Sequence, residues 1–231
     1  MIFAAGRGER MRPLTDHTPK PLLHVGGKPL IMWIIQALAQ AGWHDIVINH
    51  AWLGTQFAQI LGDGHQWGVR LQYSAEGDTP HSALETAGGI AHALPLLGNG
   101  VFLAISGDIY THFDFSSLHH PAKKMATLSA PHMHLVMVDN PMFHPQGDFV
   151  LEQNTIKNTG TPRLTYANIG LFDTRDFTNV PPHTKAKLSP LLNTAIEQKR
   201  VSGEYFSGIW HNIGNPTQLS QLDQSLRTAQ S

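Results

Sequence analysis

The sequence contains no cysteine, and this absence excludes two kinds of site. Without thiols there is neither a disulfide framework nor a thiolate metal site, and a reducing compartment suits such a chain. No apolar run reaches the ~20 residues of a membrane-spanning helix, and no signal-peptide pattern precedes the first glycine-rich loop. We therefore expect a cytoplasmic protein with no membrane partner.

Charge of one sign is not in excess either. Lysine and arginine total 16 against 17 aspartates and glutamates, so no basic surface predicts binding of nucleic acid. The 15 histidines include no H-E-x-x-H pair, and this argues against a zinc site of that kind. At 231 residues the chain is long enough to bury the core of one large domain.

Strands and helices alternate through the first half of the chain. Leu30, Trp33, Ile34 and Leu38 have helical spacing, and Gly42 follows them as a stop signal. We expect strands at 1–5, 44–52, 68–77 and 100–110, and helices at 29–42, 53–64 and 85–98. This alternation predicts an α/β fold whose largely parallel sheet is covered by helices on both faces.

The pattern changes from about residue 134. We expect strands at 134–141, 147–156 and 163–172, and closing helices at 187–200 and 216–230. Fewer helices between the strands predict a smaller, mixed β region packed on the first half. The expected organisation is one domain over 1–231, with a first part at 1–133 and a second at 134–231.

A glycine-rich loop, AAGRGERMRPLTDHTPKPLL, follows the first strand. It lacks the Lys-Ser/Thr ending of a P-loop, and Met11 stands where a Rossmann fingerprint needs a small residue. What remains is a G-x-G turn whose backbone N–H groups can face an anion, with Arg10, Arg12 and Lys20 nearby. Two flanking prolines restrict the backbone around Lys20. The alternative is a flexible connection with solvated charges.

The extended string AAGRGERMRPLTDHTPKPLLHVGGKPL resembles the signature of sugar-1-phosphate nucleotidyltransferases. Further segments are similar to one branch, the N-acetylmuramate-1-phosphate uridylyltransferases of peptidoglycan recycling. They are VINHAWLG, LETAGGIAHALPLLG, SGD, VDNPMFHPQGDF and VSGEYFSGIW. The resemblance implies a Rossmann-like, mixed but mostly parallel sheet of the nucleotide-diphospho-sugar transferase type. It also implies a nucleotide-binding part over 1–133 and a small β-rich sugar-binding part over 134–231.

The resemblance implies a mechanism in which a sugar-1-phosphate oxygen attacks the α-phosphorus of a nucleoside triphosphate. The protein then has to hold two polyanions together and neutralise charge at the transferring phosphorus. Arg10 would grip the β- and γ-phosphates, and Lys20 would approach the reacting phosphates. The residues implied to bind the nucleotide through the loop are Ala4, Ala5, Gly6 and Gly8. Arg12 could join them or lie on the surface.

The implied cofactor is Mg²⁺, held by Asp108 in the segment AISGD. The alternative is that Asp108 only caps a turn. Members of the family usually add an aspartate in W-x-D-x-G, but this chain reads WHNIG, with Asn212 at that position. Asn212 could act as a neutral ligand, lower the metal affinity, or mark a member without activity. We favour the neutral ligand, because the phosphate-binding residues are otherwise complete.

Base and sugar contacts are also implied by the resemblance. Glu76 stands where pyrimidine-specific relatives carry a polar base contact, and Gly88 and Gly89 would face the base edge, unless they serve close helix packing. Gly147, Asp148 and Asn168 match positions of the sugar pocket. Lys187 could bind the sugar phosphate or lie exposed at a helix start. An insertion at 77–83 could form a mobile flap.

The expected activity is transfer of UMP from UTP to N-acetylmuramate 1-phosphate, with pyrophosphate as the second product. The expected partners are UTP and a sugar 1-phosphate, and the oligomeric state stays open. One alternative is guanylyl or thymidylyl transfer to a hexose 1-phosphate. Another is a regulatory protein that binds nucleotide sugars without turnover, for which Asn212 is the supporting feature.

Overall fold

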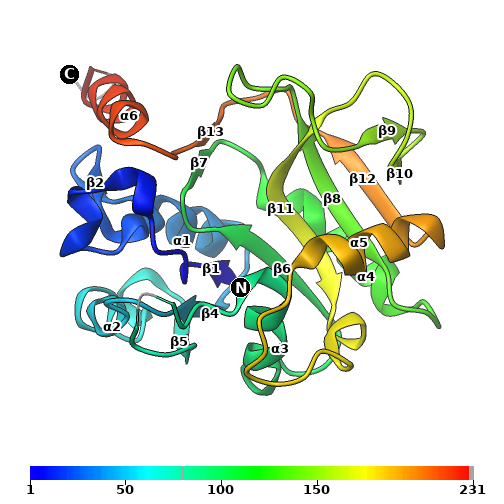
Figure 1. The fold of residues 1–231 in the computed structure, drawn as a ribbon, viewed down its shortest axis with the longest axis horizontal. Coiled ribbons are helices and arrows are strands. Elements are labelled where there is room, and N and C mark those ends of the chain that lie inside the picture. Colours follow the sequence, from blue (N-terminus) through cyan, green and yellow to red (C-terminus); the bar gives the residue numbers. More distant parts are fainter. Residues whose placement is uncertain (80, 229–231) are drawn as a thin grey trace.

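A nine-stranded mixed sheet runs through the molecule in the order β5-β4-β1-β6-β11-β8-β12-β10-β9. The structure is a computed structural model that describes residues 1–79 and 81–228. The strands of the large sheet are β1 Ile2–Phe3, β4 Asp45–His50, β5 Arg70–Ala75, β6 Val101–Ser106, β8 Met133–Val138, β9 Val150–Glu152, β10 Thr155–Lys157, β11 Thr165–Asp173 and β12 Val201–Tyr205. Figure 1 shows the sheet crossing from β5 on the left to β9 and β10 on the right.

Two short two-stranded sheets lie outside this large sheet. One pairs β2 His24–Val25 with β3 Lys28–Pro29, and the other pairs β7 Ile109–Thr111 with β13 Trp210–Asn212. The helices are α1 Leu30–Gln40, α2 Thr55–Leu61, α3 Glu85–Leu97, α4 His119–Ala126, α5 Leu188–Glu197 and α6 Pro216–Thr228. None of the described helices is long and apolar enough to cross a membrane.

Alternating apolar side chains divide each central strand between two cores. On β4, Ile46 and Ile48 join the cluster built with α1, α2 and α4, whereas Val47 joins the cluster built with α3 and α5. Successive side chains of a strand point to opposite faces of the sheet, so a strand that is covered on both faces contributes alternate residues to the two cores. The result is a helix–sheet–helix sandwich, and the expected α/β fold class is confirmed.

The first four strands of the order, β5, β4, β1 and β6, are parallel, and β1 lies between β4 and β6. After β1 the chain adds β4 and β5 on one side of it and β6 on the other. The carboxyl end of β1 is therefore the topological switch point of the sheet. Ligands of open α/β sheets bind at such points. Beyond β6 the sheet turns antiparallel through β11, and strands of the second half continue the same sheet.

Several strands and helices of the structure begin or end at other residues than the sequence predicts. The strand expected over 100–110 breaks at Gly107, so that β6 and β7 belong to different sheets. The strand expected over 147–156 is instead part of a β9–β10 hairpin that turns at Gln153 and Asn154, both with positive φ. The last helix ends at Thr228 among the described residues, so the expected extension to 229–230 lies outside them.

Core burial predicts a large difference between two phenylalanines. Phe172 is fully buried on β11, whereas Phe143 is 57% exposed in the loop after β8. Replacing Phe172 by Ala should lower the free energy of unfolding by about 3–5 kcal/mol, because it leaves a cavity. Phe143→Ala should change it by about 0.5 kcal/mol or less. Urea unfolding measures both, and equal losses would contradict this division of core and surface.

Candidate active site

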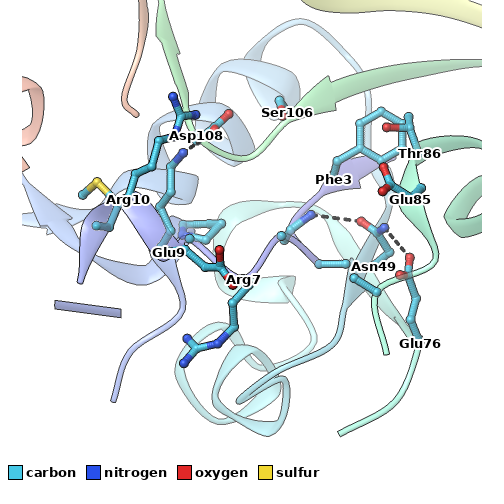
Figure 2. A pocket seen from close by; sticks show the side chains of 18 of the residues that line it. Phe3, Arg7, Glu9, Arg10, Asn49, Glu76, Glu85, Thr86, Ser106 and Asp108 are labelled. Carbon is cyan, nitrogen blue, oxygen red and sulfur yellow. Dashed lines mark hydrogen bonds and ion pairs between the residues drawn. The ribbon is translucent and has the colours of Figure 1, made fainter. Parts of the chain in front are cut away.

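A cavity of about 710 Å³ opens at the carboxyl ends of the parallel strands. The predicted site residues that line it are Ala4, Ala5, Gly6, Gly8, Arg10, Lys20, Glu76 and Asp108. Figure 2 shows Arg10 and Asp108 at one end of the cavity and Asn49 and Glu76 at the other. One end of the cavity therefore carries the cations Arg10 and Lys20, which suit phosphate, and the other end carries the buried carboxylate of Glu76.

The glycine loop is held in one shape by short-range contacts. Gly8 has φ +68°, and a Cβ there would lie 3.0 Å from Thr15 Cγ2 and 3.3 Å from Lys20 Cβ. The Thr15 hydroxyl donates a hydrogen bond to the Gly8 carbonyl at 2.8 Å. Because only glycine adopts this backbone without strain, Gly8 allows the loop to close tightly against Lys20.

Lys20 and Asp108 form a direct ion pair, with 2.5 Å between Lys20 Nζ and Asp108 Oδ2. The two side chains are only 11% and 23% exposed. Gly107 brings them together: its N–H donates to the Phe3 carbonyl at 2.8 Å, and a Cβ there would approach Pro21. The second Asp108 oxygen, Oδ1, is buried and has no hydrogen-bond partner within the described part of the chain.

Asn212 lies beside Asp108 on the neighbouring strand. It is paired with Ile109 in the two-stranded β7–β13 sheet, and the Ile213 N–H donates to the Asp108 carbonyl at 2.9 Å. Asp108 lines the cavity, whereas Asn212 is not among the lining residues and is placed near Asp108 only by the pairing of the two strands. A carboxylate and an amide are both oxygen ligands that Mg²⁺ accepts together with phosphates and water. The described residues contain no group of three His, Asp or Glu side chains that could hold a metal alone.

Arg7 and Arg10, two of the three arginines of the loop, differ in their surroundings. Arg10 is exposed and has no ion pair among residues 1–79 and 81–228, and its guanidinium lies 3.6 Å from the Cβ position of Gly214. Arg7 donates to the Thr15 carbonyl at 2.9 Å and lies over the Trp52 ring at 4.8 Å. Figure 2 shows Arg7 pointing away from Asp108. Arg10 is thus the free cation, while Arg7 supports the loop.

Glu76 is fixed at the other end of the cavity. Its Oε1 accepts a hydrogen bond from Asn49 Nδ2 at 2.6 Å, and its Oε2 accepts one from the Leu84 N–H at 2.7 Å. Burial raises the pKa of Glu76, and the two hydrogen bonds oppose this rise by favouring the carboxylate. A buried carboxyl group with a perturbed pKa in a cleft is typical of a functional site.

Gly88 and Gly89 lie in the first turns of α3 and are not among the residues lining the cavity. The Gly88 N–H donates to the Ala186 carbonyl at 3.0 Å, and a Cβ there would meet the Thr184 carbonyl. A Cβ on Gly89 would lie 2.4 Å from Glu76 Oε1. Gly88 therefore packs α3 against the segment before α5, and Gly89 leaves room for Glu76.

The predicted sugar residues lie outside the lining of this cavity. Asn168 directly precedes Ile169, which pairs with Ile105 of β6, and Ser106 at the end of β6 lines the cavity. Asp148 accepts a hydrogen bond from the Tyr166 N–H at 2.8 Å. Gly147 has φ +62°, and a Cβ there would lie 2.6 Å from Asn140 Oδ1.

The structure brings Lys185, and not Lys187, to the cavity. Lys187 precedes α5 as its capping residue, and both lysines are exposed. Further lining residues that the sequence reasoning missed are Arg7, Asn49, His81, Glu85 and Thr86. Of these, Glu85 carried no local signal, although its φ of +62° at the start of α3 marks a strained residue of the kind found at functional sites. The expected insertion 77–83 includes residue 80, which lies outside the described residues.

Fold and cavity define a nucleotide-binding α/β protein with a basic glycine loop at its switch point. The sequence profile of the nucleotidyl transferase family matches residues 1–140, and the chain belongs to this family. It is 47% identical to an N-acetylmuramate alpha-1-phosphate uridylyltransferase from Neisseria meningitidis serogroup B, over 96% of this chain and 95% of that protein. A protein with the same description from Caulobacter vibrioides is 30% identical over 94% of this chain and 91% of its own length.

Solved structures share the fold at lower identity. A structure from Bacillus anthracis, described as a candidate glucose-1-phosphate thymidylyltransferase in complex with sucrose, superposes with a TM-score of 0.83 at 20% identity. It covers 98% of this chain and 94% of that one. HddC from Yersinia pseudotuberculosis has a TM-score of 0.74 at 14% identity, over 97% of each chain.

Because the loop is tight, a side chain at Gly8 should lower both the stability of the protein and its affinity for phosphate. In Gly8→Ala the left-handed backbone should cost about 1–2 kcal/mol of unfolding free energy, and the new methyl group should displace Thr15 and Lys20. Binding of inorganic tripolyphosphate, measured by calorimetry, should weaken about fivefold or more.

The matched control is Gly27→Ala. Gly27 also has positive φ, +85°, but nothing lies within 4 Å of its Cβ position. It should lose similar stability and bind tripolyphosphate as the unchanged protein does. Unchanged binding in Gly8→Ala would show that the loop does not hold phosphate.

Proposed function

We propose that the protein transfers UMP from UTP to N-acetylmuramate 1-phosphate, releasing pyrophosphate and forming UDP-N-acetylmuramate. The observation that carries this proposal is that one cavity has Lys20 and Asp108 at one end and Glu76 at the other. The 47% identity to an enzyme of that description, over nearly the full length of both chains, supports the choice of base and sugar. The proposed reaction consumes UTP and belongs in the cytoplasm, where it would serve peptidoglycan recycling.

In this proposal the glycine loop holds the triphosphate. The backbone around Ala4, Ala5, Gly6 and Gly8 would donate N–H groups to phosphate oxygens, as such nests do. Arg10, the exposed cation without a protein partner among the described residues, would hold the β- and γ-phosphates that leave as pyrophosphate. Its position against Gly214 supports a role at the open side of the cavity.

Lys20 would neutralise charge at the transferring phosphorus. In the structure its ammonium is held by Asp108, so it is already placed and desolvated before substrate binds. A positioned donor at developing charge is commonly worth ~3–4 kcal/mol of barrier. The sugar phosphate oxygen would attack in line with the leaving pyrophosphate, and no covalent intermediate with the protein is needed.

Mg²⁺ fits this site through Asp108 and Asn212. The unpartnered Asp108 Oδ1 supports a ligand role, and the Asn212 amide would add a neutral oxygen. When bound, the ion would neutralise phosphate charge and orient the phosphoryl groups. Asp108 Oδ2 would keep its contact with Lys20, whose ammonium is then held beside the phosphates.

For the base we propose Glu76, with Gly88 and Gly89 shaping the helix that carries the surrounding residues. For the sugar we propose Asn168, Gly147 and Asp148, and either Lys187 or the closer Lys185 for the sugar phosphate. Asn168 has the strongest support, because its neighbour Ile169 pairs with Ile105 of β6, and Ser106 at the end of β6 lines the cavity.

Two other functions make different predictions. Guanylyl or thymidylyl transfer to a hexose 1-phosphate predicts turnover with GTP or dTTP. A regulatory protein predicts nucleotide binding without turnover, and Asn212 is the one feature that favours it.

Pyrophosphate release tests the proposal directly. UTP, Mg²⁺ and N-acetylmuramate 1-phosphate should give turnover, while GTP, dTTP and glucose 1-phosphate in parallel assays should be poor substitutes. Lys20→Ala should lower kcat by about 10²–10³-fold, because it removes a cation from the transition state. Arg12→Ala is the matched control, since Arg12 is 60% exposed and paired with Asp16; its kcat should stay within about twofold. Binding of UTP without turnover for any pair would favour the regulatory protein.

Asn212 predicts a change in metal dependence. Asn212→Asp should lower the Mg²⁺ concentration needed for half-maximal turnover, because it adds a negative ligand, and Asn212→Ala should raise it by about tenfold. Asn193→Ala, on the exposed side of α5, serves as the control. Equal Mg²⁺ dependence in all four proteins would exclude Asn212 as a ligand.

A further inference from the structure

A line of buried hydrogen bonds joins the glycine loop to the base end of the cavity. The Ala4 N–H donates to Asn49 Oδ1 at 3.0 Å, Asn49 Nδ2 donates to Glu76 Oε1 at 2.6 Å, and the Leu84 N–H donates to Glu76 Oε2 at 2.7 Å. Asn49 and Glu76 are 3% and 8% exposed. Figure 2 shows Asn49 between the first strand and Glu76.

The chemistry of the partners fixes the orientation of the Asn49 amide. The Ala4 backbone N–H can only donate, so it requires the amide oxygen, and the amide NH₂ is then turned to Glu76. With one donor on each oxygen, the Glu76 carboxylate cannot rotate freely. Glu76 lines the cavity, and each of its oxygens, with one donor bound, still has a lone pair that can accept a further hydrogen bond.

Gly89 provides independent support for this contact. A Cβ on Gly89 would lie 2.4 Å from Glu76 Oε1 and 2.9 Å from Asn49 Nδ2, the two atoms that form the hydrogen bond. Glycine inside a helix is less stable than alanine. The chain therefore keeps a less stable residue in α3 at the one place where a methyl group would separate Asn49 from Glu76.

We propose that Asn49 is a positioning residue for base selection, which holds Glu76 as an acceptor for the ring N–H of uracil and against the ring acceptor of cytosine. Uracil presents N3–H, which the carboxylate can accept, whereas cytosine presents an unprotonated N3 whose lone pair faces the same oxygens. Leaving two acceptors opposed in a desolvated site is a strong basis for discrimination. This inference rests on the proposed function, since it takes Glu76 as the base contact.

The contact with Ala4 extends the role of Asn49 to the phosphate end. Ala4 is the first residue after β1, and its N–H is fixed by the same amide that fixes Glu76. A base that pairs correctly with Glu76 is therefore aligned with the loop that begins at Ala4. Asn49 sets the distance between the base contact and the triphosphate.

Calorimetric binding of UTP and CTP to the full chain tests the proposal. Asn49→Ala should weaken UTP binding about tenfold and CTP binding by less than about twofold, so that the preference for UTP falls about fivefold or more. Gly89→Ala, which keeps both side chains but separates them, should reduce the preference in the same direction. It also keeps the proposal testable if Asn49→Ala does not fold.

Asn140→Ala is the matched control. Asn140 also joins several segments, through hydrogen bonds to Pro145, Arg163 and Thr165, but it lies in the second half of the chain. It should leave the UTP/CTP ratio within about twofold of the unchanged protein. A folded Asn49→Ala protein with an unchanged ratio, or an equal fall in Asn140→Ala, would overturn the proposal.

Measurements on the unchanged protein distinguish a failure of the proposed function from a failure of the proposed role of Asn49. If it turns over UTP while Asn49→Ala keeps its preference, the proposed function stands and the role of Asn49 is wrong. If it shows neither preference for UTP nor turnover with UTP, the proposed function itself fails, and the role of Asn49 fails with it.

Discussion

The carboxyl end of β1 lies between β4 and β6, and the proposed triphosphate and metal contacts depend on this position. Parallel neighbours on both sides bring the ends of three strands to one edge. The glycine loop leaves from β1, Asn49 comes from β4, and the Gly107–Asp108 turn follows β6. The hydrogen bond from the Gly107 N–H to the Phe3 carbonyl fixes two of these ends against each other. A chain with the same residues but another strand order would not bring them together.

Charge balance explains how this edge remains stable before a substrate binds. Lys20 and Asp108 are both poorly exposed, and two such charges are tolerated because they pair closely. The pair is also incomplete, since Asp108 Oδ1 has no partner among the described residues. The same two groups can therefore hold a polyanion and its counter-ion, with little rearrangement of the backbone.

Local patterns predicted the parts of the fold that depend on neighbours in sequence. Helical spacing located α1, and the apolar runs located β4 and β6, because periodicity reflects burial directly. The break at Gly107 was missed, since an apolar run does not show where a strand leaves its sheet. The role of Asn49 could not be predicted, because its partners lie 45 and 27 residues away. Lys187 was named from the sequence, and Lys185, which lines the cavity, was not considered, since the path of the segment before α5 is set by its contacts with α3.

The most direct test of the account is a crystal structure with Mg²⁺ and a UTP analogue that cannot be cleaved between the α- and β-phosphates. The account predicts uracil N3 within hydrogen-bond distance of Glu76, the triphosphate along residues 4–10, and the metal on Asp108. A nucleotide bound elsewhere, or a base turned away from Glu76 with the phosphates far from Lys20, would contradict it.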